Sequence, residues 1–173
     1  STMEVAYKQG FLETESQVKT LAQLYATNGI PYKSALIQEK FIDDGIIEKT
    51  ELALSNMAAT FRNAKEYEKA AKYYGIAASM DKDAELYRKQ AEAYMAIERF
   101  SDAVVAYNKA IDAGVKRKGI VYMGIAEANF YQEKWKEAHA AILEAKKDRN
   151  TERSAKAWEG HIKDTAQRKG VTL

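Results

Sequence analysis

Side chains that could act as metal ligands or nucleophiles are few and widely spaced. The 173-residue chain has no cysteine and two histidines, His139 and His161. Without cysteine there is no disulfide scaffold, no cysteine-based zinc site and no thiol nucleophile. The two histidines are far outside the i, i+4 spacing of helical metal sites. We therefore expect no catalytic residue, no metal and no cofactor, and we predict that the chain is not an enzyme.

One glycine-rich run has part of a phosphate-binding pattern. Residues 114–119 read Gly-Val-Lys-Arg-Lys-Gly, which matches the glycine spacing of a phosphate loop. Gly119 is followed by Ile120 and Val121, where that loop needs lysine and then serine or threonine. The run also lies between helical patterns rather than between a strand and a helix. We interpret it as an exposed turn whose positive charge complements the end of the preceding helix.

The composition indicates a folded protein without a strong charge bias. Hydrophobic residues make up 46% of the chain, which excludes wholesale disorder. Lysine and arginine number 27 against 25 acidic residues, giving a net charge of +2. No clustered basic face suggests nucleic acid as a partner. The longest uncharged stretch, residues 20–32, is too short to cross a bilayer.

An alanine-centred pattern recurs four times along the chain. The anchor residues Ala35, Ala70, Ala103 and Ala138 are separated by 35, 33 and 35 residues. In each copy an aromatic residue stands three positions before the alanine, and the segments between copies have helical periodicity. Each copy therefore predicts a helix, a turn and a second helix. One such hairpin cannot bury its apolar face alone, so neighbouring hairpins must stack.

Local signals predict where several helices begin and end. Residues 14–17, Thr-Glu-Ser-Gln, match a capping box at a helix start. Pro31 suits the first position of a helix. Gly45 and Gly114 each follow a helical pattern and precede an apolar residue, which predicts left-handed helix ends. Residues 151–168 predict one more helix with a single apolar face, suited to cap a stack of hairpins. No stretch alternates as a strand would.

The period and the alanine–aromatic pattern resemble the tetratricopeptide repeat (TPR). The residues that carry the resemblance in the second copy are Leu54, Met57, Ala58, Phe61, Ala70, Tyr74 and Ala77. The chain departs from the family at Lys82 and Val115, where a repeat often ends in proline, and at Asn129, where an aromatic is usual. The resemblance implies an all-α, right-handed α-solenoid of about four TPR-like helical hairpins with a C-terminal capping helix. We expect a single domain over 1–173, with repeats at about 16–50, 51–83, 84–118 and 119–150 and the capping helix at 151–168.

The family resemblance implies non-catalytic protein–protein binding. In such proteins the first helix of each hairpin lines a concave groove that accepts a partner peptide or helix. Counting along the predicted first helices places these residues in the groove: Asn56, Arg62, Asn63, Arg88, Lys89, Glu92, Met95, Glu127 and Tyr131. Arginine and tyrosine are among the residue types that tend to dominate interfaces.

A narrower resemblance suggests a cellular setting. Residues 11–13, 21–25 and 45–51 resemble TPR proteins that accompany TonB/ExbB/ExbD systems in gamma-proteobacteria. This likeness implies a periplasmic accessory of a bacterial TonB-type complex, with TonB-, ExbB- or ExbD-like partners and a signal segment upstream of Ser1. The alternatives are a cytoplasmic or pilus-assembly TPR adaptor and the regulatory TPR region of a larger enzyme. Formation of a homo-oligomer remains open as well.

Overall fold

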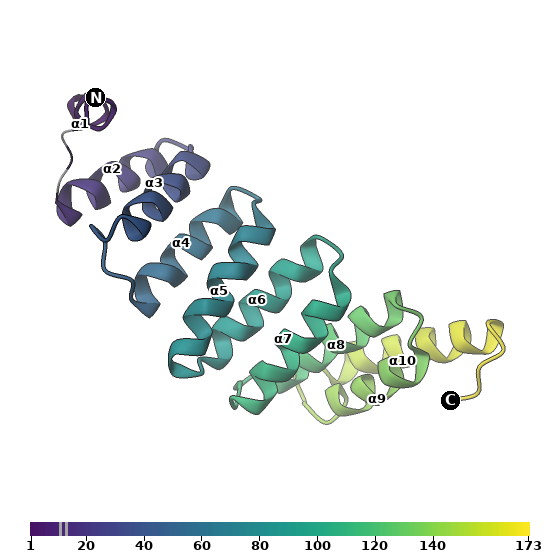
Figure 1. Ribbon diagram of the computed structural model, residues 1–173. Helices are drawn as coiled ribbons and strands as arrows, with labels where there is room; N and C mark the ends of the chain where they lie inside the picture. The colour runs from purple at the N-terminus through teal and green to yellow at the C-terminus, as the bar shows by residue number, and fades with distance from the viewer. Residues whose placement is uncertain (11, 13) are drawn as a thin grey trace. The chain divides into compact units, whose positions relative to one another are not determined.

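The computed structural model describes residues 1–10, 12 and 14–173, and these residues form ten α-helices and no β-strand. The chain divides into two compact units, residues 1–81 and 82–173. The first unit contains α1 (Thr2–Lys8), α2 (Glu15–Thr27), α3 (Pro31–Asp43), α4 (Glu51–Asn63) and α5 (Tyr67–Asp81) (Figure 1). The second unit contains α6 (Ala84–Ala96), α7 (Phe100–Asp112), α8 (Lys118–Tyr131), α9 (Trp135–Ala145) and α10 (Glu152–Arg168). The all-α prediction is confirmed, while the single domain stays a prediction.

In the first unit, α2 pairs with α3 and α4 pairs with α5 (Figure 1). The anchor alanines Ala35 and Ala70 are completely buried. An alanine at these places lets two helix backbones approach closely, and large side chains such as Phe61 and Tyr74 fill the space beside them. The short helix α1 joins the unit through a hydrogen bond of 3.0 Å from the Tyr25 hydroxyl to Glu4 Oε1.

A half-buried polar contact joins α3 and α5 in this unit. The carboxylate of Glu39 accepts a hydrogen bond of 2.8 Å from Lys69 Nζ and one of 2.6 Å from the hydroxyl of Tyr73. Burial raises the pKa of Glu39, but the two hydrogen bonds outweigh it and hold that pKa below its ordinary value. Burial and the bond to Glu39 both raise the pKa of Tyr73. Both groups therefore keep their ordinary charge states at neutral pH.

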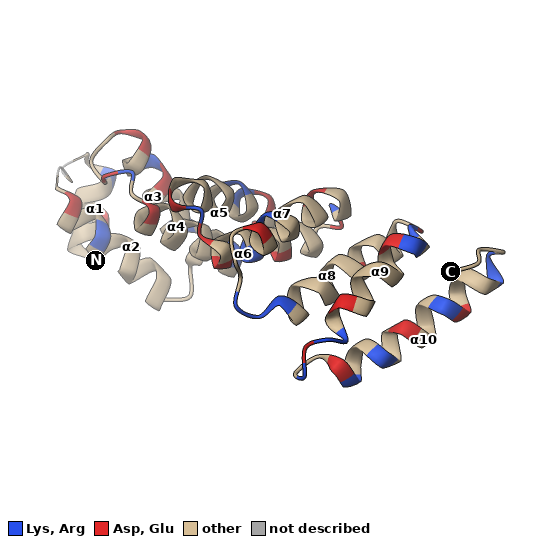
Figure 2. Ribbon diagram, turned by 90° about the horizontal axis from the view of Figure 1, so that it is seen from below, with Lys and Arg blue, Asp and Glu red and all other residues tan. Residues whose placement is uncertain are grey.

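In the second unit, α6 pairs with α7, α8 pairs with α9, and α10 packs on α9. Ala103 and Ala138 are completely buried in its core. The helix α10 buries one face, which includes Ile162, and charged residues lie along the length of the helix (Figure 2). Among the described residues, no helix combines the length and the apolar character needed to cross a membrane.

The predicted helix boundaries agree with the structure. Thr14 and Gln17 form both hydrogen bonds of a capping box, and Pro31 is the first residue of α3. Gly45 and Gly114 adopt positive φ angles of 77° and 83°. After each glycine, an amide hydrogen bond returns to a carbonyl of the last helical turn, as in a Schellman motif.

Four other helix ends have the same left-handed geometry without glycine. The residues with positive φ, between 53° and 62°, are Lys65, Lys82, Glu98 and Glu133. A side chain in this conformation costs roughly 1 kcal/mol relative to glycine. The local sequence did not predict these left-handed positions, because lysine and glutamate give no signal for them.

Glu159 of α10 is the centre of an ion-pair cluster with α9. Its carboxylate oxygens lie 2.5 Å from Lys146 Nζ, 2.8 Å from Lys163 Nζ and 3.6 Å from His139 Nε2. The side chain of Glu159 is only 13% exposed. The hydrogen bonds from Lys146 and Lys163 lower its pKa to about 2, against a weaker opposing effect of burial. The cluster therefore stabilises the packing of α10 against α9.

We expect Glu159→Gln to lower the free energy of unfolding at pH 7 by about 1–2 kcal/mol. The pKa of Glu159 is depressed by folding, so its contribution is present above about pH 4.5 and is lost as the pH falls towards 2. Urea denaturation between pH 7 and pH 2.5 should show the wild type and the variant converging at the acid end. Glu152→Gln, at an exposed position of the same helix, is the control and should change little. A constant difference at all pH values would contradict this role of the Glu159 charge.

Candidate functional site

The nine predicted groove residues lie on three first helices, and none of them is fully buried. Helix α4 of the first unit carries Asn56, Arg62 and Asn63, and the second unit carries the other six on α6 and α8: Arg88, Lys89, Glu92, Met95, Glu127 and Tyr131. Each unit has its own pocket on the faces of these helices. In the part of the chain that the structure describes, no three His, Asp or Glu side chains come together as metal ligands would.

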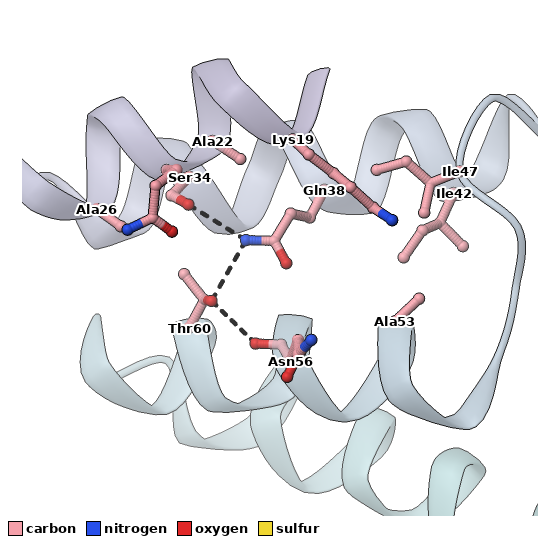
Figure 3. A pocket seen from close by; sticks show the side chains of 11 residues that line it. Lys19, Ala22, Ala26, Ser34, Gln38, Ile42, Ile47, Ala53, Asn56 and Thr60 are labelled. Carbon is pink, nitrogen blue, oxygen red and sulfur yellow. Dashed lines mark hydrogen bonds between the residues drawn. The ribbon is translucent and has the colours of Figure 1, made fainter. Parts of the chain in front are cut away.

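The pocket of the first unit lies between α2, α3 and α4 and has a volume of about 460 Å³ (Figure 3). Its lining residues are Lys19, Ala22, Gln23, Ala26, Ser34, Gln38, Ile42, Ile47, Ala53, Asn56 and Thr60. The small side chains on α2 and α4 leave this space open, because alanine does not fill the gap between facing helices. Asn56 is among the lining residues, whereas Arg62 and Asn63 lie further along α4 and are exposed outside the lining. Their role in partner binding stays a prediction.

The centre of this pocket is polar. The amide nitrogen of Gln38 donates to Ser34 Oγ at 3.2 Å and to Thr60 Oγ1 at 3.3 Å, and the Thr60 hydroxyl donates to the backbone oxygen of Asn56 at 2.9 Å. Figure 3 shows these three polar side chains converging from α3 and α4, with the amine of Lys19 on α2 nearby. The bonds fix the Gln38 side chain as a bridge between the two hairpins.

The pocket of the second unit brings four predicted residues together. Glu92 and Met95 come from α6, and Glu127 and Tyr131 come from α8. The pocket has a volume of about 590 Å³, and its other lining residues are Ala96, Glu98, Phe100 and Tyr107. Because α6 and α8 are the first helices of successive hairpins, the predicted spacing along each helix places these residues on one face.

An exposed aromatic stack forms one wall of this second pocket. The rings of Phe100 and Tyr131 lie 5.1 Å apart at an interplanar angle of 22°. Tyr131 is 54% exposed, although it is among the largest apolar side chains of the unit. The contact with Phe100 holds the Tyr131 ring in one orientation and leaves much of its surface accessible.

Tyr107 of α7 reaches the same pocket from within the core. The residue is 6% exposed, and its ring packs directly on Gly124 of α8. A Cβ atom at Gly124 would lie 2.5 Å from Tyr107 Cζ and 2.7 Å from its hydroxyl oxygen. The Tyr107 ring therefore fits in this place because residue 124 has no Cβ atom. Burial raises the pKa of Tyr107, and the charges of Glu92 and Glu127 raise it further, so the hydroxyl stays protonated.

Arg88 is bound within its own helix. Its guanidinium donates to Glu85 Oε2 at 2.8 Å and to Glu92 Oε1, and the side chain is 13% exposed. Burial opposes the charge of Arg88, but the two carboxylates outweigh it and raise its pKa. Neither Arg88 nor Lys89 lines the pocket. Their role as partner-binding residues stays a prediction.

Four lining residues were absent from the predicted set: Ala96, Glu98, Phe100 and Tyr107. Phe100 stands three positions before the anchor Ala103 and Tyr107 four positions after it, and these repeat positions indicate core roles. The pattern gave no signal for Ala96 or Glu98. The geometry shows that Phe100 and Tyr107 also contribute surface to the pocket. Phe100 and Tyr107 are seven residues apart and so lie on one face of α7. This spacing could have predicted that they line the same surface.

Comparison with known proteins defines the class of fold. No protein-family model and no curated protein sequence matches this chain. Solved structures do match, in 70 chains, and a TPR domain is among them. The predicted α-solenoid of TPR-like helical hairpins is therefore confirmed as the fold class.

Three of these structures are similar over most of this chain. The Arabidopsis OM64 TPR domain has 21% identity and a TM-score of 0.58, with 66% of this chain and 94% of that chain covered. A double mutant of MamA RS-1 has 13% identity and a TM-score of 0.68, with coverages of 89% and 86%. The APC/C hetero-tetramer Cut9–Hcn1 has 14% identity and a TM-score of 0.60, and the match covers 92% of this chain and 32% of that one. At these identities the likeness concerns the fold.

Proposed function

We propose that this chain is a non-catalytic protein-interaction scaffold that binds a peptide or helix of a partner on the first-helix faces of its hairpins. The observation that carries the proposal is the exposed stack of Tyr131 on Phe100 at the pocket of the second unit. Aromatic side chains that are held rigid and left accessible bind partners at a low cost in conformational entropy. The TPR-like fold supports the proposal, because its hairpins present such faces side by side.

Site-specific photo-crosslinking tests this proposal. A photoreactive phenylalanine analogue at position 131 should crosslink a partner protein in the cells that make this protein, because the ring is exposed at the pocket. The same analogue at Val105, which is 55% exposed on the second helix α7, is the matched control. Crosslinks at 131 that are absent at 105 are expected.

Two outcomes would contradict the proposal. Equal crosslinking at both positions would show that exposure alone, and not the pocket, determines contact. A crosslink at 131 that joins only two copies of this chain would show that this surface forms a homo-oligomer and does not bind a partner protein. Mass spectrometry of the crosslinked product distinguishes the two cases.

We further propose that the partner belongs to a bacterial TonB-type envelope complex, which would make this chain a periplasmic accessory. The support is the sequence resemblance of residues 21–25 and 45–51 to TPR proteins of TonB/ExbB/ExbD systems. Of the third matching stretch, Phe11 and Glu13 are outside the residues that the structure describes. The cytoplasmic or pilus-assembly adaptor and the regulatory region of a larger enzyme are the competing assignments.

The same crosslinked material decides between these assignments. TonB-, ExbB- or ExbD-like proteins attached at position 131 would support the envelope accessory. Pilus-assembly components, unrelated cytoplasmic proteins or a catalytic polypeptide would each reject that accessory role and leave the interaction scaffold standing. Fractionation of the cells with an antibody against the protein provides an independent check of the periplasmic location.

A further inference from the structure

The charged residues that line the pocket of the second unit are all acidic. They are Glu92, Glu98 and Glu127. Glu92 forms an ion pair with Arg88. Glu127 is half-buried as a residue and, like Glu98, has no ion-pair partner among the described residues. Such a carboxylate favours the approach of a positive group.

The aromatic side chains of Tyr131 and Phe100 lie beside these carboxylates in the pocket lining and can also attract a cation. Tyr131 presents an accessible ring that Phe100 holds in place. The face of an aromatic ring attracts an ammonium or guanidinium group, and the attraction strengthens when water is excluded. Met95 adds a flexible apolar side chain to the lining, which suits the alkyl stem of a long basic residue.

The hydroxyl of Tyr107 offers a hydrogen-bonding group at the surface of the pocket. Tyr107 is more than nine-tenths buried and lines the pocket. In the described part of the chain, the structure shows no hydrogen bond to or from this hydroxyl. The hydroxyl oxygen is not among the fully buried unpartnered atoms of the described residues, so it is open to the pocket. A hydroxyl can accept a hydrogen bond from an N–H donor, so a ligand that carries such donors would satisfy it.

We propose that this pocket receives an arginine side chain from the partner protein. The guanidinium lies on the ring of Tyr131 and donates hydrogen bonds to the Glu127 carboxylate and the Tyr107 hydroxyl. Arginine fits better than lysine because its group is planar, stacks on aromatic rings and presents several N–H donors in a fixed fork. This inference rests on the proposed function, since it names the chemistry of the segment that binds there.

A pair of isosteric peptides tests the inference on the full chain. One is an acetylated and amidated Gly-Ser-Arg-Ser-Gly peptide, and the other carries citrulline, which is uncharged, in place of arginine. Titration into ¹⁵N-labelled protein, followed by NMR, should shift the amide signals of α6 and α8 around the pocket. We expect about tenfold weaker binding of the citrulline peptide, and about tenfold weaker binding of the arginine peptide to Glu127→Gln.

The control variant is Glu137→Gln, which removes an exposed carboxylate of α9 outside the pocket and should bind as the wild type does. Tyr131→Ser keeps all charges, and it should also weaken binding if the guanidinium lies on the ring. Well-dispersed spectra of each variant establish that it is folded. Equal binding of both peptides, shifts away from the pocket, or no effect of Glu127→Gln would overturn the inference.

Failure of this inference is distinguishable from failure of the proposed function. Crosslinking at position 131 does not depend on arginine in the partner. A specific crosslink together with no preference for the arginine peptide would overturn the arginine site and leave the interaction scaffold standing. Loss of both results would overturn both proposals.

Discussion

Gly124→Ala should lower the free energy of unfolding by about 2 kcal/mol, although alanine is the better helix former. The new Cβ atom would lie 2.5 Å from Cζ of the Tyr107 ring. The residue that carries this ring is 6% exposed, so the ring gives up buried contacts if it moves away from the new Cβ atom. The overpacking cost of about 1–3 kcal/mol therefore exceeds the helix-propensity gain of about 1 kcal/mol.

Gly160→Ala is the matched control for this prediction. Gly160 also lies within a helix of the second unit, and a Cβ atom there would meet nothing within 4 Å beyond its chain neighbours and the nearby backbone of its own helix. Its substitution should raise the free energy of unfolding by up to about 1 kcal/mol. Urea denaturation followed by circular dichroism measures both changes. Stabilisation by both substitutions would show that the Tyr107 ring does not occupy the space over Gly124.

Glu39→Ala should lower the free energy of unfolding by about 2 kcal/mol. The substitution removes the acceptor for the Tyr73 hydroxyl, which is on a residue that is 8% exposed. A buried hydroxyl without a partner carries its full desolvation cost. Lys69 loses a partner as well, but its amine is exposed enough to be solvated.

A double-mutant cycle isolates the pair of Glu39 and Tyr73. Glu39→Ala combined with Tyr73→Phe should cost clearly less than the sum of the two single changes, because no unsatisfied group remains. Glu48→Ala, at an exposed position of the same unit, should change the free energy of unfolding by less than about 0.5 kcal/mol. Additive single changes would show that the two groups do not interact in solution.

The sequence predicted the features that depend on residue size and local hydrogen bonding. The anchor alanines are buried because only a small side chain fits where two helices approach, and the aromatic residue three positions before marks the same helix. The capping box at Thr14 and the left-handed ends at Gly45 and Gly114 follow from side chains and glycines a few residues apart. These features need no knowledge of distant contacts.

Features that depend on packing between helices could not be predicted from the sequence. The pairing of Arg88 with Glu85 and Glu92, in contrast, could have been predicted, because these residues stand three and four positions apart within one helix. Tyr107 was assigned to the core, and its second role at the pocket arises only because Gly124 on another helix admits its ring. The division of the chain between residues 81 and 82 also depends on contacts that no local pattern reports.

The pairing of helices has a consequence for how each unit folds and opens. Within each unit most of the contact is between helices that follow one another in the chain, with smaller contacts that include those between α1 and α3, α6 and α8, and α8 and α10. Contacts between near neighbours close short loops, which favours rapid folding. Opening can also proceed stepwise from an end helix, since that helix has a neighbour on one side only. In the first unit, α1 is an end helix with few contacts, to α2 and through Tyr7 to Phe41 of α3, so its amide hydrogens should exchange with solvent before those of α4.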